Sequence, residues 1–432
     1  MNKNKNIEIS QELKIQISKD GQIKKFSLYG FLKNLRFFEP YLVLYLMTNG
    51  FTFFQLGILF SIKEIVVNIF EIPSGFIADR WGYKNELILC FILYIISFIF
   101  FFSCTAFWIG ILAVVFFGLA ESCRSGTHKA MILIYLENKD WNKYKTFVYG
   151  RTRSFSLLGS SISAVLSILI LFVVSDSKYL FIASIIPYIL DAILILSYPS
   201  YLNKSETQKN RITKPTVRIQ LKELGQTFKT KRNLISLLVS NGIFESVIKS
   251  TKDLIQPMLK IALASSGVVL ISSLSVDNHL KIILGLTYCV IYIISSMASR
   301  NAYRLNEVMN SRNLFIILYL ILGVVFIGIS ATALVPVSII TLFLIMYLLR
   351  NLRKPVYVDV LTSQINKDTS ATIFSISSQL ESLLTIILVP IGGYIADHYG
   401  IKYFMLGVGI FIFLYYAIQM ISRLFYKKEK LV

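Results

Sequence analysis

The sequence predicts an all-α membrane protein with twelve transmembrane helices in two pseudo-symmetric six-helix halves. Apolar runs of about 20 residues, the length that crosses the hydrocarbon of a bilayer, recur along the chain. The composition agrees, because 55% of the 432 residues are hydrophobic and the mean hydropathy is +0.64. Short motifs of the first half also return in the second half in the same order, as a duplication would produce.

The apolar runs place the helices. In the first half we expect them at residues 26–48, 53–78, 86–103, 107–134, 154–174 and 179–198. In the second half we expect them at residues 233–260, 281–298, 314–331, 335–352, 371–396 and 403–425. The halves then span residues 26–198 and 233–425, joined by a basic cytoplasmic linker at 199–232 and flanked by cytoplasmic tails at 1–25 and 426–432. Residues 262–274 stay open between a partly buried outer loop and a further short membrane segment.

The net charge of +20 is explained by the orientation of the chain in the membrane and not by nucleic-acid binding. In membrane proteins Lys and Arg accumulate in cytoplasmic segments. With twelve crossings and both termini inside, the outer loops hold only Lys178, Lys260, Lys281 and Lys402. A further crossing at 262–274 would invert the rest of the chain. We therefore expect a multi-pass protein of the cell (inner) membrane with both termini in the cytoplasm, in contact with the lipid bilayer and with no nucleic acid.

Signs of enzyme chemistry are missing from the sequence. The four cysteines lie scattered among apolar segments, without the spacing of a metal site or a disulfide framework. No Ser-His-Asp arrangement or phosphate-binding loop is found either. The polar first 25 residues contain no apolar core of a signal peptide. The sequence predicts no enzymatic activity, no cofactor and no metal site.

One charged stretch between two apolar runs, Ser74–Leu87, is the most informative motif. Gly75 and Gly82 suit a close turn, so we expect a tight hairpin loop. A related string begins at Ala298, with Ser299 in place of the aspartate. Further matches follow in the same order: Glu39-Pro40 with Gln256-Pro257, Lys129–Leu136 with Lys354–Leu361, and Ser156–Leu158 with Ser382–Leu384.

The pattern Gly-x-x-Ala-Asp-Arg-x-Gly-x-Lys in this stretch resembles the loop signature between helices 2 and 3 of the major facilitator superfamily, including its drug:proton antiporter-like branch. The resemblance implies two six-helix halves around a mid-membrane cavity and secondary active transport by alternating access. It also implies a gating role for the signature loop, formed by Gly75, Asp79, Arg80, Gly82 and Lys84.

In that family Asp79 would help to lock the outward-facing state against basic groups and the start of helix 11. Asp368-Thr369-Ser370 looks like the cap of that helix. A similar string at Gly392–Lys402 falls on the outer face by the charge count, and we give it no gating role.

Ionisable side chains inside the membrane normally face a partner or a wet cavity. The resemblance implies that helices 1, 4, 7 and 10 line this cavity. Helices 1, 4 and 7 carry polar stripes here, whereas helix 10 is more apolar, with Arg350 and Arg353 at its inner end. The alternative for each charge is a salt bridge that only holds the bundle together. The predicted proton-coupling and cavity residues are Arg36, Glu39, Glu64, Glu121, Arg124, Glu245, Lys249 and Lys252.

The first candidate for proton coupling is Glu39 with Arg36, because Pro40 removes a backbone donor and can leave the helix locally open. The second is Glu121 with Arg124. His128 could relay protons near neutral pH, and the alternative is a solvated histidine at the end of its helix.

These features predict a transporter of a small-molecule substrate, with proton-coupled efflux of drugs or metabolites as the first hypothesis and a monomer as the working unit. Helix 5 lacks the Gly-Pro-rich signature of many drug antiporters, which weakens that assignment. One alternative is a proton-coupled importer of a small anionic nutrient that uses Arg36, Arg124, Lys249 and Lys252. Another is a sensor that kept the fold without transport.

Overall fold

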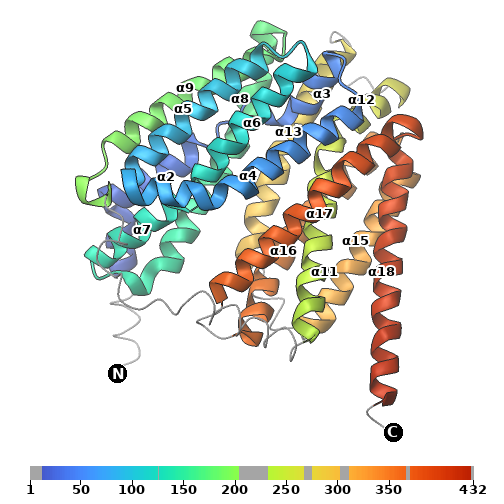
Figure 1. The fold of residues 1–432 in the computed structure, drawn as a ribbon. Helices are drawn as coiled ribbons and strands as arrows, with labels where there is room; N and C mark the ends of the chain where they lie inside the picture. The colour runs from blue at the N-terminus through green and yellow to red at the C-terminus, as the bar shows by residue number, and fades with distance from the viewer. Residues whose placement is uncertain are drawn as a thin grey trace. The chain divides into compact units, whose positions relative to one another are not determined.

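The computed structural model describes residues 12–124, 126–203, 232–266, 275–301, 311–365 and 370–429. The regular structure in these ranges is helical (Figure 1). Ten helices within them are long and apolar enough to cross a membrane. The all-α membrane fold that the sequence predicts is therefore confirmed.

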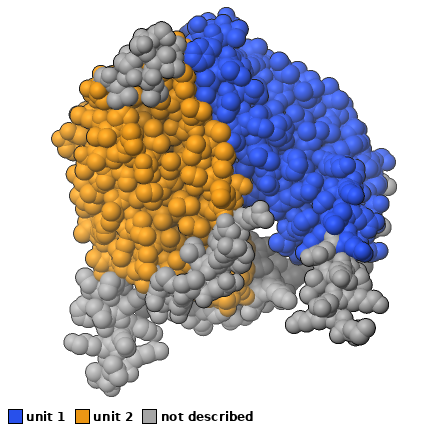
Figure 2. All heavy atoms as spheres, turned by 180° about the vertical axis from the view of Figure 1, so that it is seen from behind, with its two compact units in different colours: residues 1–45, 62–214 blue, residues 46–61, 215–432 orange. Residues whose placement is uncertain are grey.

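The first compact unit contains residues 1–45 and 62–214 (blue in Figure 2). Within it α5 packs on α6 and α9, and α2 packs on α8. Its helices are α2 (Gly21–Leu32), α3 (Leu42–Thr48, shared with the second unit), α4 (Phe53–Trp81, also shared), α5 (Tyr83–Phe102), α6 (Phe107–Arg124), α7 (Thr127–Asn138), α8 (Lys145–Val174) and α9 (Tyr179–Leu196).

The second compact unit contains residues 46–61 and 215–432 (orange in Figure 2). Here α15 packs on α18, α11 on α17 and α13 on α16. Its helices are α11 (Arg232–Thr251), α12 (Ile255–Ser266), α13 (Val276–Asn301), α15 (Ser311–Ala331), α16 (Pro336–Gln364), α17 (Ser370–His398) and α18 (Ile401–Glu429).

The first helix of each half is broken, where the sequence predicted one continuous helix. After α2 ends at Leu32 the chain reaches a 3-10 turn, η1 (Glu39–Tyr41), before α3 begins. In the second half η5 (Lys252–Leu254) separates α11 from α12. Both breaks lie at or just before a proline, Pro40 or Pro257, which has no backbone N–H to continue the helix. Neither broken helix is among the ten uninterrupted spans, which accounts for the difference from twelve.

The predicted signature loop is a turn of a single residue. The helix α4, expected to end at residue 78, continues through Asp79 and Arg80 to Trp81, and α5 begins at Tyr83. Gly75, Asp79 and Arg80 therefore lie on a helix, and the wider loop expected from residue 74 onward is wrong. Gly82 between the helices has φ +89°. A Cβ atom there would lie 2.3 Å from the carbonyl oxygen of Asn203, so the turn requires glycine.

Lys84 fixes this turn to the end of α9. Its ammonium group donates hydrogen bonds to the carbonyl oxygens of Leu196, at 3.0 Å, and Tyr198, at 2.8 Å. Its backbone N–H donates to Oδ1 of Asn203 at 2.8 Å. These contacts hold the α4–α5 turn against the segment that follows α9.

The string at Gly392–Lys402 has a capping role within the second unit. Oδ1 and Oδ2 of Asp397 on α17 accept hydrogen bonds from the backbone N–H groups of Phe53 and Phe54, each at 2.8 Å. A carboxylate is favourable at this position, because the first N–H groups of a helix have no partner inside it. Gly393 permits the approach, since a Cβ atom there would lie 2.3 Å from the carbonyl oxygen of Phe53.

Other predicted boundaries change as well. The helix α8 begins at Lys145, so much of the charged stretch before residue 154 is helical, and α16 continues to Gln364 instead of ending near residue 352. The first five residues of 262–274 belong to α12. Four further predictions lie outside the described residues: most of the linker, the second signature copy beyond residue 301, Asp368-Thr369 of the predicted cap, and residues 267–274.

Candidate functional site

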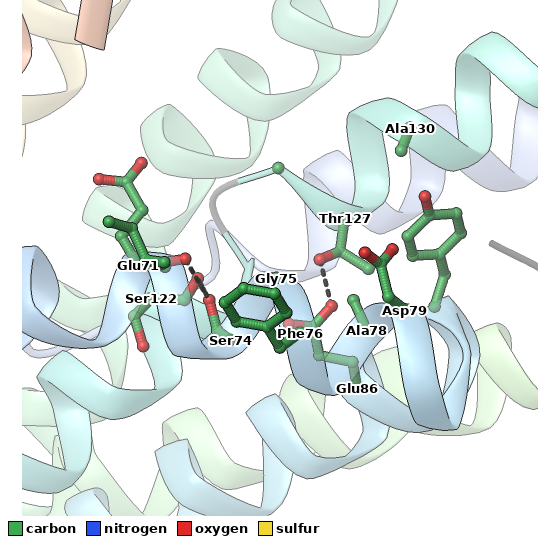
Figure 3. Close-up of a pocket in the computed structure, with 13 residues that line it drawn as sticks. Glu71, Ser74, Gly75, Phe76, Ala78, Asp79, Glu86, Ser122, Thr127 and Ala130 are labelled. Carbon is green, nitrogen blue, oxygen red and sulfur yellow. Dashed lines mark hydrogen bonds between the residues drawn. The ribbon is translucent and has the colours of Figure 1, made fainter. Parts of the chain in front are cut away.

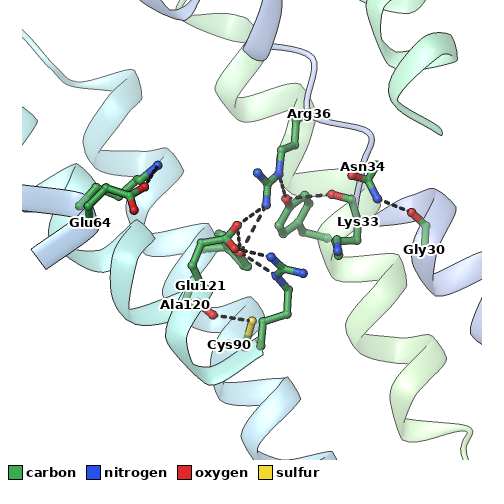
Figure 4. Close-up of polar contacts among 12 residues, drawn as sticks. Gly30, Lys33, Asn34, Arg36, Glu64, Cys90, Ala120 and Glu121 are labelled. Atoms are coloured by element: carbon green, nitrogen blue, oxygen red, sulfur yellow. Dashed lines mark hydrogen bonds and ion pairs between the residues drawn. The ribbon is translucent and has the colours of Figure 1, made fainter. Parts of the chain in front are cut away.

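A half-buried charge cluster forms in the first unit beside the break in its first helix. The stretch after α2 places Arg36 against α6, with Nη2 of Arg36 2.7 Å from Oε1 of Glu121 (Figure 4). Nε of Arg36 donates to the hydroxyl of Tyr188 at 2.8 Å, and that hydroxyl donates to the carbonyl oxygen of Lys33 at 3.0 Å. The side chain of Arg36 thereby links the broken segment to both α6 and α9.

Glu121 has partners on each carboxylate oxygen. Besides Arg36, its Oε1 accepts a hydrogen bond from the hydroxyl of Tyr94 at 2.6 Å, and its Oε2 pairs with Arg124 one helical turn away. The guanidinium group of Arg36 also lies over the ring of Phe117, 5.1 Å from its centroid. Charge-assisted hydrogen bonds of this kind stabilise the ionised carboxylate in a poorly hydrated site. We call these residues the Glu121 cluster: Arg36, Tyr94, Glu121, Arg124 and Tyr188.

The structure groups the predicted first-unit residues differently from the sequence analysis. Arg36 forms its ion pair with Glu121, whereas the sequence paired it with Glu39, which is half-buried at the start of η1. Glu64 lies apart from the cluster in Figure 4, with its carboxylate 3.2 Å from the ammonium group of Lys63. His128 is only 9% exposed and stacks on Tyr29, so the solvated histidine considered as its alternative is wrong.

The second unit contains a corresponding cluster. Oε2 of Glu245 on α11 lies 2.9 Å from Nε of Arg350 on α16. Lys249, one turn further along α11, has its ammonium group 2.9 Å from Oε1 of Glu381 on α17. Lys252 lies in η5 and pairs with its neighbour Asp253 at 2.9 Å. Of the three predicted residues here, Glu245 and Lys249 thus contact other helices, and the described ion pair of Lys252 is local.

Arg353 is the largest fully buried side chain of the described residues. Its Nη1 donates to Oδ1 of Asn241 at 2.8 Å, while Nε and Nη2 have no described hydrogen-bond partner. The guanidinium group is enclosed by aromatic rings, with the ring centroid of Phe244 4.1 Å and that of Phe315 4.7 Å away. A desolvated guanidinium group is attracted to such ring faces.

The two units share one arrangement with the charges exchanged. In each, an ion pair joins the broken first helix to the fourth helix of that half: Arg36 to Glu121, and Glu245 to Arg350. Sequence reasoning noted Arg350 and Arg353 at the inner end of helix 10 without including them among the site residues, and it did not consider Glu381. The available signal was an isolated charge within an apolar helix, which applies to Glu381.

The signature residues Gly75 and Asp79 line an open pocket of about 480 Å³ in the first unit (Figure 3). Asp79 is exposed on the last turns of α4, and Glu86 of α5 is 1% exposed. The hydroxyl of Thr127 donates a hydrogen bond to the Glu86 carboxylate. The signature therefore contributes to an acidic pocket where α4, α5 and α7 meet. No group of side chains in the described ranges could hold a metal ion.

Two helical units with interrupted first helices and ten membrane-length helices are the architecture of a multi-pass secondary transporter. Residues 30–378 match the family model of the Major Facilitator Superfamily, and the chain belongs to this superfamily. An uncharacterized MFS-type transporter, YxaM of Bacillus subtilis (strain 168), is 37% identical over 90 residues. That match covers 21% of this chain and 23% of the relative, so the chain spans less than a quarter of the relative it matches.

Solved structures share the fold. A mutant of the nucleoside transporter NupG superposes with a TM-score of 0.74 at 14% identity, covering 92% of this chain and 98% of that chain. NupG itself gives 0.71 at 13% identity, covering 93% and 98%. A POT family transporter in complex with a thioalcohol conjugated peptide gives 0.64 at 14% identity, covering 93% and 95%. At these identities the likeness shows the fold alone.

Proposed function

We propose that this chain is a proton-coupled secondary transporter that exports a small drug or metabolite by alternating access, as in the drug:proton antiporter-like branch of the superfamily. The observation that carries the proposal is the contact between Arg36 and Glu121. It ties a carboxylate inside the bundle to the break in the first helix, where regular helical hydrogen bonding is interrupted between α2 and η1.

The coupling follows from elementary electrostatics. While Arg36 and Arg124 both contact Glu121, the carboxylate is stabilised in its ionised form. If the broken segment moves and withdraws Arg36, the carboxylate keeps its burial and loses one cation, and its affinity for a proton rises. Proton binding at Glu121 and withdrawal of Arg36 by the first helix would therefore favour each other.

The test is solute flux in everted membrane vesicles under an imposed proton gradient. The panel would contain lipophilic cations, antibiotics, nucleosides and peptides, the last two because the similar structures are a nucleoside transporter and a transporter in complex with a conjugated peptide. We expect gradient-driven accumulation by the wild type and its loss in Glu121→Gln. Asp176→Asn, which removes an exposed carboxylate paired only with Lys178 among described ion pairs, is the matched control and keeps the flux. Full gradient dependence in Glu121→Gln would contradict the proposal, and Glu39→Gln tests the first sequence candidate in parallel.

A second candidate, uptake of a small anionic nutrient, is favoured by the charge of Arg353. In the described part of the second unit Glu245 pairs with Arg350 and Glu381 with Lys249, and no carboxylate pairs with Arg353. The unbalanced cation would suit an anionic substrate. Right-side-out vesicles would accumulate organic anions with the opposite dependence on the proton gradient, and Arg353→Met would lose this uptake while Lys178→Met kept it. Binding without flux in either vesicle type would favour a sensor.

A further inference from the structure

Asp191 is a fully buried carboxylate near the end of α9. Its side chain is 0% exposed, and neither Oδ1 nor Oδ2 has a hydrogen-bond partner among the described residues. It is the sole charged residue between Tyr179 and Leu196, within one of the ten membrane-length helices. Burial without a partner strongly disfavours the ionised carboxylate. The protonated acid carries no such cost.

The cation that faces Asp191 is Lys33, at the end of α2 where the first helix breaks. Lys33 is the cation that acts electrostatically on Asp191, yet no ion pair joins them within 4.0 Å in the described structure. The ammonium group of Lys33 instead lies over the ring of Tyr29, 5.9 Å from its centroid. The buried hydroxyl of Tyr29 has no described hydrogen-bond partner either.

This region adjoins the Glu121 cluster at the same break, and Tyr188 of that cluster connects the two. Tyr188, one turn before Asp191, donates its hydroxyl hydrogen to the backbone of Lys33, so α9 and the end of α2 are held together. The other titratable or charged groups that act on Asp191, Lys33 or Tyr29 come from every neighbouring element: Arg36 in the break after α2, Cys90 on α5, Glu121 and Arg124 on α6, His128 on α7 and Tyr198 after α9.

We propose that Asp191 is a second proton-binding site, which holds a proton in the conformation described and exchanges it for an ion pair with Lys33 when the broken segment moves. In this step the O–H bond of the Asp191 carboxyl group breaks, the proton leaves to water on the side to which the site opens, and the Lys33 ammonium group compensates the carboxylate. The proton site stands on the geometry alone, whereas its link to transport rests on the proposed function.

Infrared spectra of the purified full-length chain, recorded across pH, test the site without a substrate. We expect a C=O band of a protonated carboxyl group at neutral pH that Asp191→Asn lacks. Glu86→Gln identifies the contribution of the other deeply buried acid of this unit, and Asp176→Asn is the exposed control that leaves the band unchanged. A band that is identical in wild type and Asp191→Asn would overturn the proposal.

Two further variants keep the test decisive. If Asp191→Asn does not fold, Asp191→Glu retains an acid and should shift the band, and an unshifted band would overturn the assignment. Lys33→Met removes the cation, so the Asp191 band should persist to a pH higher by about 1–3 units. An unchanged titration in that variant would overturn the pairing with Lys33. The infrared spectra test the Asp191 site, and the vesicle flux of Glu121→Gln tests the proposed transport. Either proposal can therefore fail while the other holds.

Discussion

Nη2 of Arg36 lies 2.7 Å from Oε1 of Glu121, and this contact joins the interrupted first helix to α6. The two side chains are 16% and 18% exposed, so water screens their interaction only in part. The pair belongs to a network in which each member has at least one further hydrogen bond. Its stability and its function should therefore both depend on the two residues jointly.

We predict that Arg36→Met destabilises the chain by about 1.5–3 kcal/mol, because Glu121 loses a charged hydrogen-bond partner and keeps Arg124 and Tyr94. Thermal unfolding in detergent measures the change. In the double variant Arg36→Met with Glu121→Gln, the loss should be smaller than the sum of the single losses, since the residues contact each other. Additive losses would contradict the direct pairing.

The turn between α4 and α5 gives a second prediction. Gly82→Ala should cost about 1–3 kcal/mol, because Gly82 has φ +89° and a Cβ atom would collide with Asn203. Gly75→Ala on the same signature is the matched control. A Cβ atom at Gly75 meets nothing within 4 Å, and alanine favours a helix interior by roughly 0.5–1 kcal/mol. Equal shifts of the unfolding temperature would show that the signature glycines share one role, contrary to the structure.

The cap at the start of α4 gives a third. Asp397→Ala removes the acceptor for the N–H groups of Phe53 and Phe54 and should cost about 0.5–2 kcal/mol. Hydrogen exchange at these two amides should accelerate. Asp397→Asn keeps an acceptor but loses the charge that favours a helix N-terminus, so its effect should be intermediate. Unchanged exchange in Asp397→Ala would contradict the cap.

The predicted orientation can be tested by cysteine labelling in a variant without the native cysteines. Asp176→Cys, between α8 and α9, should react with a membrane-impermeant maleimide in intact cells. Lys143→Cys, exposed in the 3-10 turn before α8, should react only after permeabilisation. The reverse pattern would place both termini outside. This labelling separates the two orientations because the sites flank one membrane crossing, α8.

The native Cys104 offers a pH-dependent control for such labelling. It lies in the segment between α5 and α6, and burial raises the pKa of its thiol to about 11. The raised pKa means that the thiol stays protonated at neutral pH, and the reactive thiolate appears only as the pH approaches that value. A chain with Cys104 as its one cysteine should therefore remain unlabelled near pH 7. Rapid labelling there would show that the segment opens in solution.

The internal repeat illustrates how far sequence reasoning went towards the site. It paired Glu39-Pro40 with Gln256-Pro257, and both prolines lie at helix breaks in the structure. It also identified Arg36, Glu121, Glu245 and Lys249, which the two clusters contain. It did not pair Arg36 with Glu121, because sequence spacing shows which residues share a helix and says nothing of the facing helix. It also overlooked Asp191, the isolated charge of an apolar helix.

The sequence by itself determined the membrane class, the helical architecture, the duplication and the approximate place of the crossings. These follow from local physics: in hydrocarbon a chain must satisfy its own backbone hydrogen bonds, and about 20 apolar residues are needed for each helix. Only the tertiary structure decided how far the first helices are interrupted, which charges pair and which stay alone. Those outcomes depend on the distance between side chains of neighbouring helices, because an ion pair such as Glu245 with Arg350 forms only within a few ångströms.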